Sequence, residues 1–338
     1  MRTLPAVALF TAAVALVACE KDGAIASKGS GPLRAEEKAL LEALPGGNVG
    51  LMGGNYYRLQ DFLQSSLASS MMSAVEQMSP GMRAWSTCFV QAGKGLQMLG
   101  SIAFEGGTLT MRYAMKGFSI EQIEACAKQA SFAAERDGDG KFVSIETPTA
   151  LGPHRTGYLL LPGGVLVTRV AMPLPTLGSG GGAVRPSTRA DLEADVAAAA
   201  RTNATADAEL VAALARIDRK RAIWFVGDAT ATPAADQLGR LRGWLDLDDA
   251  GGFAMEVAVQ VRDRAVADQV AAGVPQLKRQ AGSLGGEVGK VVGGLRFERK
   301  GDELRFGLKM TGAQVQAITA QLEPYFGAMG GGALGGTP

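Results

Sequence analysis

LQMLGSIAFEGGTLTMRYAM, residues 96–115, consists of two apolar runs on either side of a Gly-Gly pair at residues 106–107. Apolar runs of this length around a glycine turn are typical of a β-hairpin. LRGWLDLDDAGGFAMEVAVQV, residues 241–261, repeats the pattern around a second Gly-Gly pair at residues 251–252. The sequence therefore predicts a similar hairpin in each half of the chain.

The segments that surround the two hairpins also correspond. Each hairpin is preceded by a short apolar strand and followed by a helical pattern, and each half then closes with another hairpin. In the first half these segments are NVGLM (48–52), SIEQIEACAKQASF (119–132) and GYLLLPGGVLVTRV (157–170). In the second half they are AIWFVG (222–227), RAVADQVAAGVPQLKRQA (264–281) and GGLRFERKGDELRFGLKM (293–310). The chain thus contains a partial internal repeat.

A helix is also predicted between the opening strand and the central hairpin of each half. In the first half, apolar residues recur every three or four positions, as on one face of an amphipathic helix: Leu59, Phe62, Leu63, Leu67, Met71, Val75 and Met78. Residues 81–95 continue this as a second short helix, and the equivalent segment of the second half, PAADQLGRL (233–241), is much shorter. The order of strand, helix, hairpin, helix and further strands is that of a split βαβ unit. We therefore expect an α+β fold of two tandem ferredoxin-like units with extra hairpin strands.

A segment rich in Gly, Pro and Ser divides the two units. PLPTLGSGGGAVRPSTR, residues 173–189, has the composition of a linker. The predicted organisation is a signal peptide at 1–18, a flexible tether at 19–35, the first unit at 36–172, the linker at 173–189, the second unit at 190–327 and a disordered tail at 328–338. One or two helices open the second unit, marked by Leu192, Val196, Ala200, Leu210, Leu214 and Ile217.

The chain begins with MRTLPAVALFTAAVALVAC, residues 1–19. One cation, Arg2, precedes an apolar run at residues 4–18, which is the order of an export signal. The tetrad LVAC at residues 16–19 resembles the lipobox of bacterial lipoprotein precursors, and polar residues follow directly at 20–22. The sequence therefore predicts an exported lipoprotein.

The resemblance implies that Cys19 becomes the first residue of the mature chain and carries a diacylglycerol thioether and an amide-linked acyl chain. Each buried methylene contributes about 0.8 kcal/mol, so several chains hold such a protein at a bilayer. Glu20 after the cysteine implies the outer membrane, with the body facing the periplasm or the cell surface. An uncleaved membrane anchor is one alternative, although the apolar run is shorter than the about 20 residues that a bilayer core requires. A plain secretory signal is the other.

Two cysteines remain after the signal, Cys88 and Cys126. Export would place them in an oxidising compartment, where an even pair usually forms a disulfide. Cys126 lies on the inward stripe of the helix predicted at 119–132, so it could meet Cys88 across the core. Closing the loop between them would stabilise the fold by about 4 kcal/mol. The alternative is two buried thiols that do not meet.

The composition is that of a globular protein without a strong electrostatic preference. Hydrophobic residues make up 47% of the chain, which argues against disorder. The 34 basic and 33 acidic residues nearly cancel, and Arg2 is the only charged residue of the predicted signal. We therefore expect neither nucleic acid nor an anionic lipid surface as a partner of the body.

The sequence offers few candidates for catalysis or metal binding. The chain has one histidine, His154, and contains no Gly-x-Ser-x-Gly motif whose serine could form a catalytic triad with it. A position in a loop or at a strand end accounts for His154. Zinc needs about four ligands, which one histidine and two paired cysteines do not supply. Asp137 and Asp139 resemble the start of a calcium loop, but Phe142 stands where that loop requires glycine, and a tight turn explains the segment better.

Asp246 and Asp248 are the remaining candidates. Strand alternation places both carboxylates on one face, which would allow a weak divalent-cation site, and the alternative is a solvated hairpin end. The methionines that crowd the first unit are interpreted as core filling rather than as copper ligands.

Together these observations predict a membrane-anchored envelope lipoprotein with a non-catalytic binding or scaffolding role. The prediction includes no cofactor, and its envelope protein partner is not identified by the sequence. The alternative is a periplasmic carrier or sensor of an apolar ligand, with the Met-rich stripe lining the cavity. An enzyme that uses only the carboxylates of Asp246 and Asp248 is a third hypothesis.

Overall fold

The computed structural model describes residues 31–55, 72, 76, 79–93, 97–105, 108–149, 153–173, 185–228, 237–247, 251–283, 285–318 and 320. Cys19, the predicted signal peptide and the tail predicted at 328–338 therefore lie outside the described residues, as does most of the helix predicted from Leu59 to Met78. Among the helices of the described ranges, none combines the length and the apolar character that crossing a bilayer requires.

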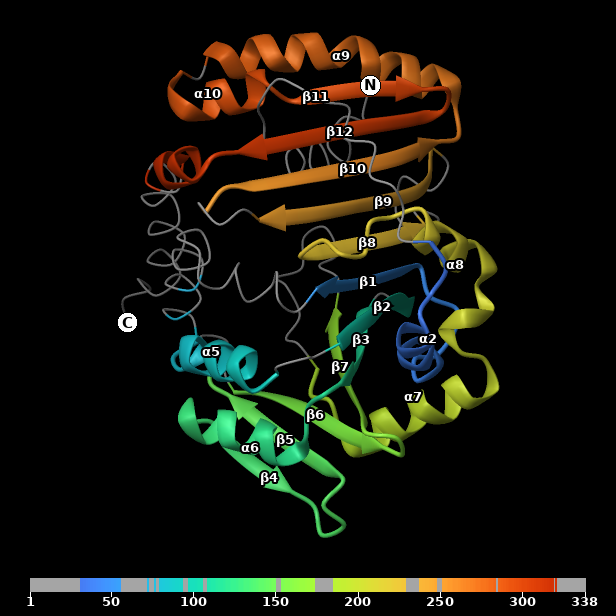
Figure 1. The fold of residues 1–338 in the computed structure, drawn as a ribbon, viewed down its shortest axis with the longest axis vertical. Helices are drawn as coiled ribbons and strands as arrows, with labels where there is room; N and C mark the ends of the chain where they lie inside the picture. The colour runs from blue at the N-terminus through green and yellow to red at the C-terminus, as the bar shows by residue number, and fades with distance from the viewer. Residues whose placement is uncertain are drawn as a thin grey trace, which may run out of the picture.

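The described residues form strands and helices in alternating groups along the chain (Figure 1). The strands are β1 (Gly50–Asn55), β2 (Gln97–Glu105), β3 (Thr108–Lys116), β4 (Ala133–Arg136), β5 (Phe142–Thr147), β6 (His154–Leu161), β7 (Val165–Pro173), β8 (Ile223–Asp228), β9 (Leu238–Leu247), β10 (Phe253–Val261), β11 (Arg296–Lys300) and β12 (Glu303–Met310). The helices are α2 (Ala35–Glu42), α5 (Met82–Ala92), α6 (Ile120–Gln129), α7 (Arg189–Arg201), α8 (Ala208–Ala215), α9 (Arg264–Ser283) and α10 (Gly286–Gly293).

These strands join a single twelve-stranded sheet in the order β11-β12-β10-β9-β8-β1-β2-β3-β7-β6-β5-β4 (Figure 1). The prediction of two tandem ferredoxin-like units is therefore wrong. A split βαβ unit contains a parallel pair of strands, which a crossover helix connects. Here β1 pairs antiparallel with β2 on one side and antiparallel with β8, from the other half of the chain, on the other.

The contact between β1 and β8 gives the physical reason for this difference. Gly53 of β1 lies opposite Trp224 of β8, and a Cβ at Gly53 would lie 2.4 Å from the indole. Glycine leaves this space open, so a large aromatic side chain from the second half packs directly on the backbone of the first. The opening strands of the two halves thus pair with each other, which the order of elements within one half does not reveal.

The individual hairpins and several helices are confirmed. The pairs β2–β3, β6–β7, β9–β10 and β11–β12 are the hairpins expected from the paired apolar runs. The helices expected at 81–95, at 119–132, after the linker and at 264–281 are α5, α6, α7 with α8, and α9. The segment 233–241 differs from expectation, because its last four residues belong to β9.

Helices cover both faces of the sheet. On one face, α2, α7 and α8 surround a core that includes Leu51, Trp224 and Trp244. On the opposite face, α5 and α6 pack near β5, and α9 and α10 pack over the β10–β12 end of the sheet (Figure 1). Alternation along each strand explains the two layers: Ala114 faces the first core, and its neighbour Met115 faces the second.

The first described residues are bonded to the second half of the chain. Arg219, which follows α8, donates to the carboxylate of Glu37 in α2 at 3.1 Å. The same guanidinium donates to the carbonyl oxygens of Gly31 and Pro32 at 3.0 and 2.9 Å. The end of the predicted tether therefore meets the folded body beside α8.

Candidate functional site

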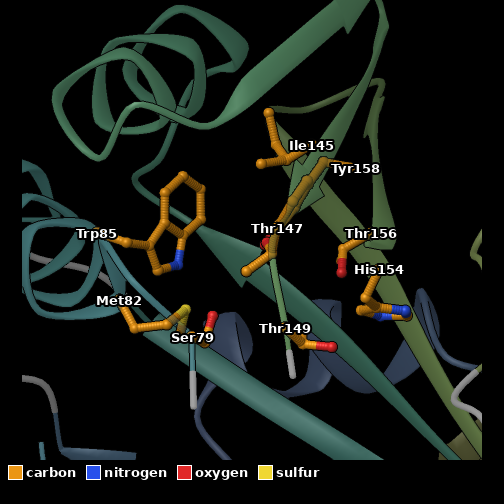
Figure 2. A pocket seen from close by; sticks show the side chains of 9 residues that line it. All are labelled: Ser79, Met82, Trp85, Ile145, Thr147, Thr149, His154, Thr156 and Tyr158. Carbon is orange, nitrogen blue, oxygen red and sulfur yellow. The ribbon is translucent and has the colours of Figure 1, made fainter. Parts of the chain in front are cut away.

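A half-open cavity of about 280 Å³ lies between α5 and the strands β5 and β6 (Figure 2). Apolar groups, hydroxyl groups and one imidazole line it together: Ser79, Met82, Trp85, Ile145, Thr147, Thr149, His154, Thr156 and Tyr158. Its volume lies just below the range of small-molecule sites, which is about 300 to 1,000 Å³. This cavity is the candidate binding site.

The start of α5 fixes the helical wall of the cavity. Gly81, directly before the helix, has a φ of 89° in the left-handed region, and a Cβ there would lie 2.4 Å from the carbonyl oxygen of Ala130. The carboxylate of Glu76 accepts hydrogen bonds from the backbone N–H groups of Arg83 and Gly81, both at 2.8 Å, which lower the pKa of Glu76. These bonds satisfy donors that the first turn of a helix leaves open. The helix therefore begins at a defined place beside the cavity.

A disulfide joins this helix to its neighbour. Cys88 of α5 and Cys126 of α6 are bonded, with their Cα atoms 5.3 Å apart, which confirms the predicted pairing. Cys126 is fully buried on the inward face of α6, as the helical stripe predicts. Because α6 packs on β4 and β5, the bond also links the helical wall of the cavity to the strands of the opposite wall.

Trp85 belongs to an aromatic cluster beside the cavity. Its ring centroid lies 5.9 Å from those of Phe89 and Phe132 and 6.5 Å from that of Tyr158. Phe89 in turn stacks on Phe118, with centroids 4.5 Å apart. Tilted and offset arrangements at these distances are favourable for aromatic rings. The neighbouring rings therefore hold the indole in place while it forms part of the cavity wall (Figure 2).

Strand alternation builds the opposite wall. β5 and β6 pair antiparallel, with Ile145 opposite Thr156 and Thr147 opposite His154. Residues opposite each other in such a pair project from the same face, and so do residues two positions apart. All four side chains, together with that of Tyr158, therefore face α5 across the cavity (Figure 2).

The cavity is uncharged near neutral pH. None of its nine lining side chains is acidic, and none is a lysine or an arginine. Burial lowers the pKa of His154 below its usual value, which favours the neutral imidazole. Burial also raises the pKa of Tyr158, so its hydroxyl stays protonated. A charged ligand would find no opposite charge in this lining.

The hydroxyl of Ser79 donates to the carbonyl oxygen of Pro148 at 2.5 Å, which ties the segment before α5 to the end of β5. Tyr158 is 8% exposed, and its ring belongs to the aromatic cluster with Trp85 while its side chain lines the cavity. A tyrosine hydroxyl can both donate and accept a hydrogen bond.

Asp246 lies far along the sheet from this cavity and bonds within the protein. Its carboxylate accepts hydrogen bonds from Arg221 at 3.0 Å and from the backbone N–H of Ala222 at 3.3 Å. The Arg221 guanidinium also lies over the ring of Trp244, 4.2 Å from its centroid. Asp248, the other half of the weak metal candidate, lies outside the described residues. Within the described ranges, no three or more His, Cys, Asp or Glu side chains gather as a metal site would require.

The acidic turn that resembles a calcium loop is also bonded within the protein. Arg189, at the start of α7, pairs with Asp137 and with Asp139, the latter at 2.8 Å. The hydrogen bond from Arg189 lowers the pKa of Asp139. The turn therefore anchors α7 to the β4–β5 hairpin.

The cavity is not predicted from the sequence. His154 is expected in a loop or at a strand end, and no role is expected for Trp85. The available signal was the alternation of T-x-T at 147–149 and H-x-T-x-Y at 154–158, which places hydroxyls and an imidazole on a strand face that faces a helix. The three-residue spacing of Met82 and Trp85 places both on one helical face.

Comparison with known proteins gives few matches. No protein-family model matches the chain, and no curated protein matches it. Among solved structures, crystal form III of TP0453 is 7% identical, with 83% of this chain and 98% of that chain covered and a TM-score of 0.45. Crystal form I of TP0453 is 8% identical, with 83% and 96% covered and a TM-score of 0.43.

Proposed function

We propose that this chain is a lipid-anchored lipoprotein of the bacterial envelope whose folded body has a non-catalytic binding role. The observation that carries the proposal is the tetrad LVAC at residues 16–19, followed at once by the polar residues 20–22. In such a precursor the thiol of Cys19 is acylated. Glu20 favours the outer membrane as the site of anchoring.

The position of Gly31 supports a short tether. Its carbonyl oxygen accepts a hydrogen bond from Arg219, and its backbone N–H donates to the carbonyl oxygen of Ala215 at 3.2 Å. Only the residues from Cys19 to Gly31 then separate the lipid from the body. A flexible chain of that length has a root-mean-square reach of about 20 Å. The body would therefore stay close to the bilayer surface.

The cavity beside α5 supports a binding role for the body. It combines an apolar wall with hydroxyl groups, as small-molecule sites commonly do. Its described lining contains no cysteine or carboxylate, and its one histidine, His154, lies opposite Thr147 in the β5–β6 pair. This composition suits recognition better than acid–base or nucleophilic chemistry.

Metabolic labelling tests the anchor. The full precursor, expressed in a Gram-negative bacterium with a clickable palmitate, is expected to incorporate the label, and Cys19→Ser is expected to lose it. The double variant Cys88→Ser/Cys126→Ser is the matched control, because it removes the other two cysteines of the chain and is expected to keep the label.

Two results would overturn the proposal of a lipid anchor. One is equal labelling of the wild type and the Cys19→Ser variant. The other is an intact mass of the wild-type protein that shows the leader still attached.

A further inference from the structure

We propose that the cavity between α5 and β5–β6 binds a neutral sugar ring, with an apolar face of the ring on Trp85 and its hydroxyls toward Thr147, Thr156 and His154. This inference rests on the binding role proposed above, of which it names the ligand class. It does not depend on the lipid anchor.

The charge of the lining selects a neutral ligand. The cavity contains no acidic side chain, no lysine and no arginine. Carboxylate and phosphate ligands are usually met by Arg, Lys or a helix N-terminus. At the start of α5, the backbone N–H groups of Gly81 and Arg83 already donate to Glu76, and that of Met82 donates to the carbonyl oxygen of Ser79. An anionic ligand, including a fatty acid, would therefore enter without a counter-charge.

The two walls of the cavity differ in chemistry, and this selects a ligand with two different sides. The α5 wall presents Met82 and Trp85, whereas the β6 wall presents His154 and Thr156 (Figure 2). A purely apolar ligand would cover these polar groups without bonding them, which is unfavourable. A purely polar one would leave the indole and the thioether without contacts. A ligand with one apolar face and a polar rim satisfies both walls.

The type of polar group then points to hydroxyls on the ligand. Threonine and tyrosine hydroxyls both donate and accept, and a neutral imidazole has one donor and one acceptor. Hydroxyl groups on a ligand have the same double capacity, so each can bond in whichever direction the wall requires. Tyr158, which also lines the cavity, offers a further hydroxyl of this kind. A pyranose ring combines such hydroxyls with faces of C–H groups that can stack on an indole.

The test uses the full lipidated protein in a detergent without a sugar head group. The probes are glucose, galactose and N-acetylglucosamine, observed by saturation-transfer NMR and by tryptophan fluorescence. Trp224 and Trp244 are almost fully buried in a different core, so a ligand-dependent change in fluorescence reports on Trp85. At least one of the three sugars is expected to bind, with a dissociation constant in the millimolar range.

Isosteric variants test the site. Thr147→Val and Thr156→Val each remove one hydroxyl with little change in shape, and each is expected to weaken binding about threefold to tenfold. Trp85→Leu is expected to abolish the saturation transfer. Thr110→Val is the matched control: Thr110 is fully buried in β3, away from the cavity lining, and the variant is expected to bind as the wild type does. Circular dichroism and an intact Cys88–Cys126 bond show that each variant is folded.

Three results would overturn the sugar site. The first is the absence of binding for all three sugars at tens of millimolar. The second is binding that neither threonine variant nor Trp85→Leu weakens. The third is a co-purifying acyl lipid, detected by native mass spectrometry, that the Trp85→Leu variant loses, which would identify an apolar carrier instead. Labelling of Cys19 is independent of all three, so failure of the sugar site leaves the anchoring proposal standing.

Discussion

At the scale of single residues, Arg219 connects the first described residues to the second half of the chain. Its side chain is 3% exposed and donates to Glu37 as well as to three backbone carbonyl oxygens, those of Gly31, Pro32 and Leu214. A buried charge pair of this kind adds little net stability compared with apolar residues, but removing one partner leaves the other charge uncompensated. The pair therefore makes the fold sensitive to single changes.

We predict that Arg219→Met lowers the free energy of unfolding by about 3 to 5 kcal/mol. The double variant Arg219→Met/Glu37→Met is expected to be more stable than Arg219→Met alone, because it leaves no buried charge without its buried partner. Urea denaturation followed by the fluorescence of Trp224 and Trp244 measures both. Arg34→Met is the control, since the Arg34 side chain is 66% exposed although it also pairs with Glu37. A loss for Arg219→Met no larger than for this control would contradict the prediction.

Glu37 is predicted to contribute to the loss of stability in acid. Burial alone would raise its pKa, but hydrogen bonds from Arg219 and Arg34 outweigh burial, so the pKa lies below the usual glutamate value. The folded state then binds this proton more weakly than the unfolded state does. The stability from Glu37 is present above the unfolded pKa, about 4.3, and is lost as the pH falls through the lower folded value.

The Glu37→Gln variant tests this pH dependence. Between about pH 6 and pH 3, its urea midpoint is expected to fall less than that of the wild type, because one linked proton is missing. Glu36→Gln is the control, since Glu36 is exposed on the same turn. If the urea midpoints of the wild type and of Glu37→Gln fell in parallel with pH, protonation of the Glu37 carboxyl would not be coupled to unfolding.

The residues of the cavity show what sequence patterns reveal at this scale. The pairing of Cys88 with Cys126 was predictable because redox context and helical phase both pointed to it. His154 was found in the sequence, but its place in a cavity depends on a helix that is far away along the chain. Such a juxtaposition has no local signature, so the site itself was not predicted. The anchoring at Cys19 stays a prediction.

At the scale of elements, the disulfide holds α5 against α6 and so shapes one wall of the cavity. Val90 is the only buried residue of α5, and Met82, Ala84 and Phe89 are among its half-buried residues that pack on the same core. The helix also depends on its aromatic contacts, on Glu76 and on the covalent bond. We therefore expect α5 to be the element most affected by reduction.

The prediction is that Cys88→Ser/Cys126→Ser lowers the free energy of unfolding by about 4 kcal/mol, the chain-entropy value for a loop of this length. Reduction of the wild type by dithiothreitol should have a similar effect, which serves as the control for the serine substitutions themselves. Hydrogen exchange should increase in α5 before it increases in β2 and β3. Unchanged exchange in α5 would show that the bond is not what holds the helix.

Most elements were predictable because their signals are local. Each hairpin carries its own turn residues, and each helix its own apolar stripe, as in the case of α6. The segment 233–241 was misjudged because a short stretch of mixed residues fits a strand as well as a helix. There the pairing of β9 with β8 and β10 decides the outcome.

At the scale of the whole molecule, the pairing of β1 with β8 was not predictable from the sequence. The internal repeat suggested two separate units, and the same repeat instead forms two halves of one sheet. The joining of the two halves in one sheet depends on Gly53, which has no side chain and so leaves room for Trp224. Contacts between residues so far apart in the sequence cannot be inferred from periodicity.

Gly53→Ala is therefore predicted to destabilise the entire protein, by about 1 to 3 kcal/mol. The added methyl would collide with the indole of Trp224 and with Leu99, which both lie under 3 Å from its position. Thermal unfolding by calorimetry measures the effect. The control is Gly273→Ala in α9, where nothing lies within 4 Å and the better helix propensity of alanine should stabilise the protein by up to about 1 kcal/mol. An unaltered melting temperature for Gly53→Ala would refute the close packing at this junction.

The order of the strands leaves β4 and β11 at the two edges of the sheet. All four residues of β4 are exposed, and Arg136 at its end pairs with Glu121 and Glu124 of α6. β11, with the sequence RFERK, carries charge at four of its five positions. Another copy of the chain could add a strand at either edge only by desolvating these charges. Charged edge strands therefore discourage edge-to-edge association. The broad sheet can therefore exist at high local density without growing into fibres.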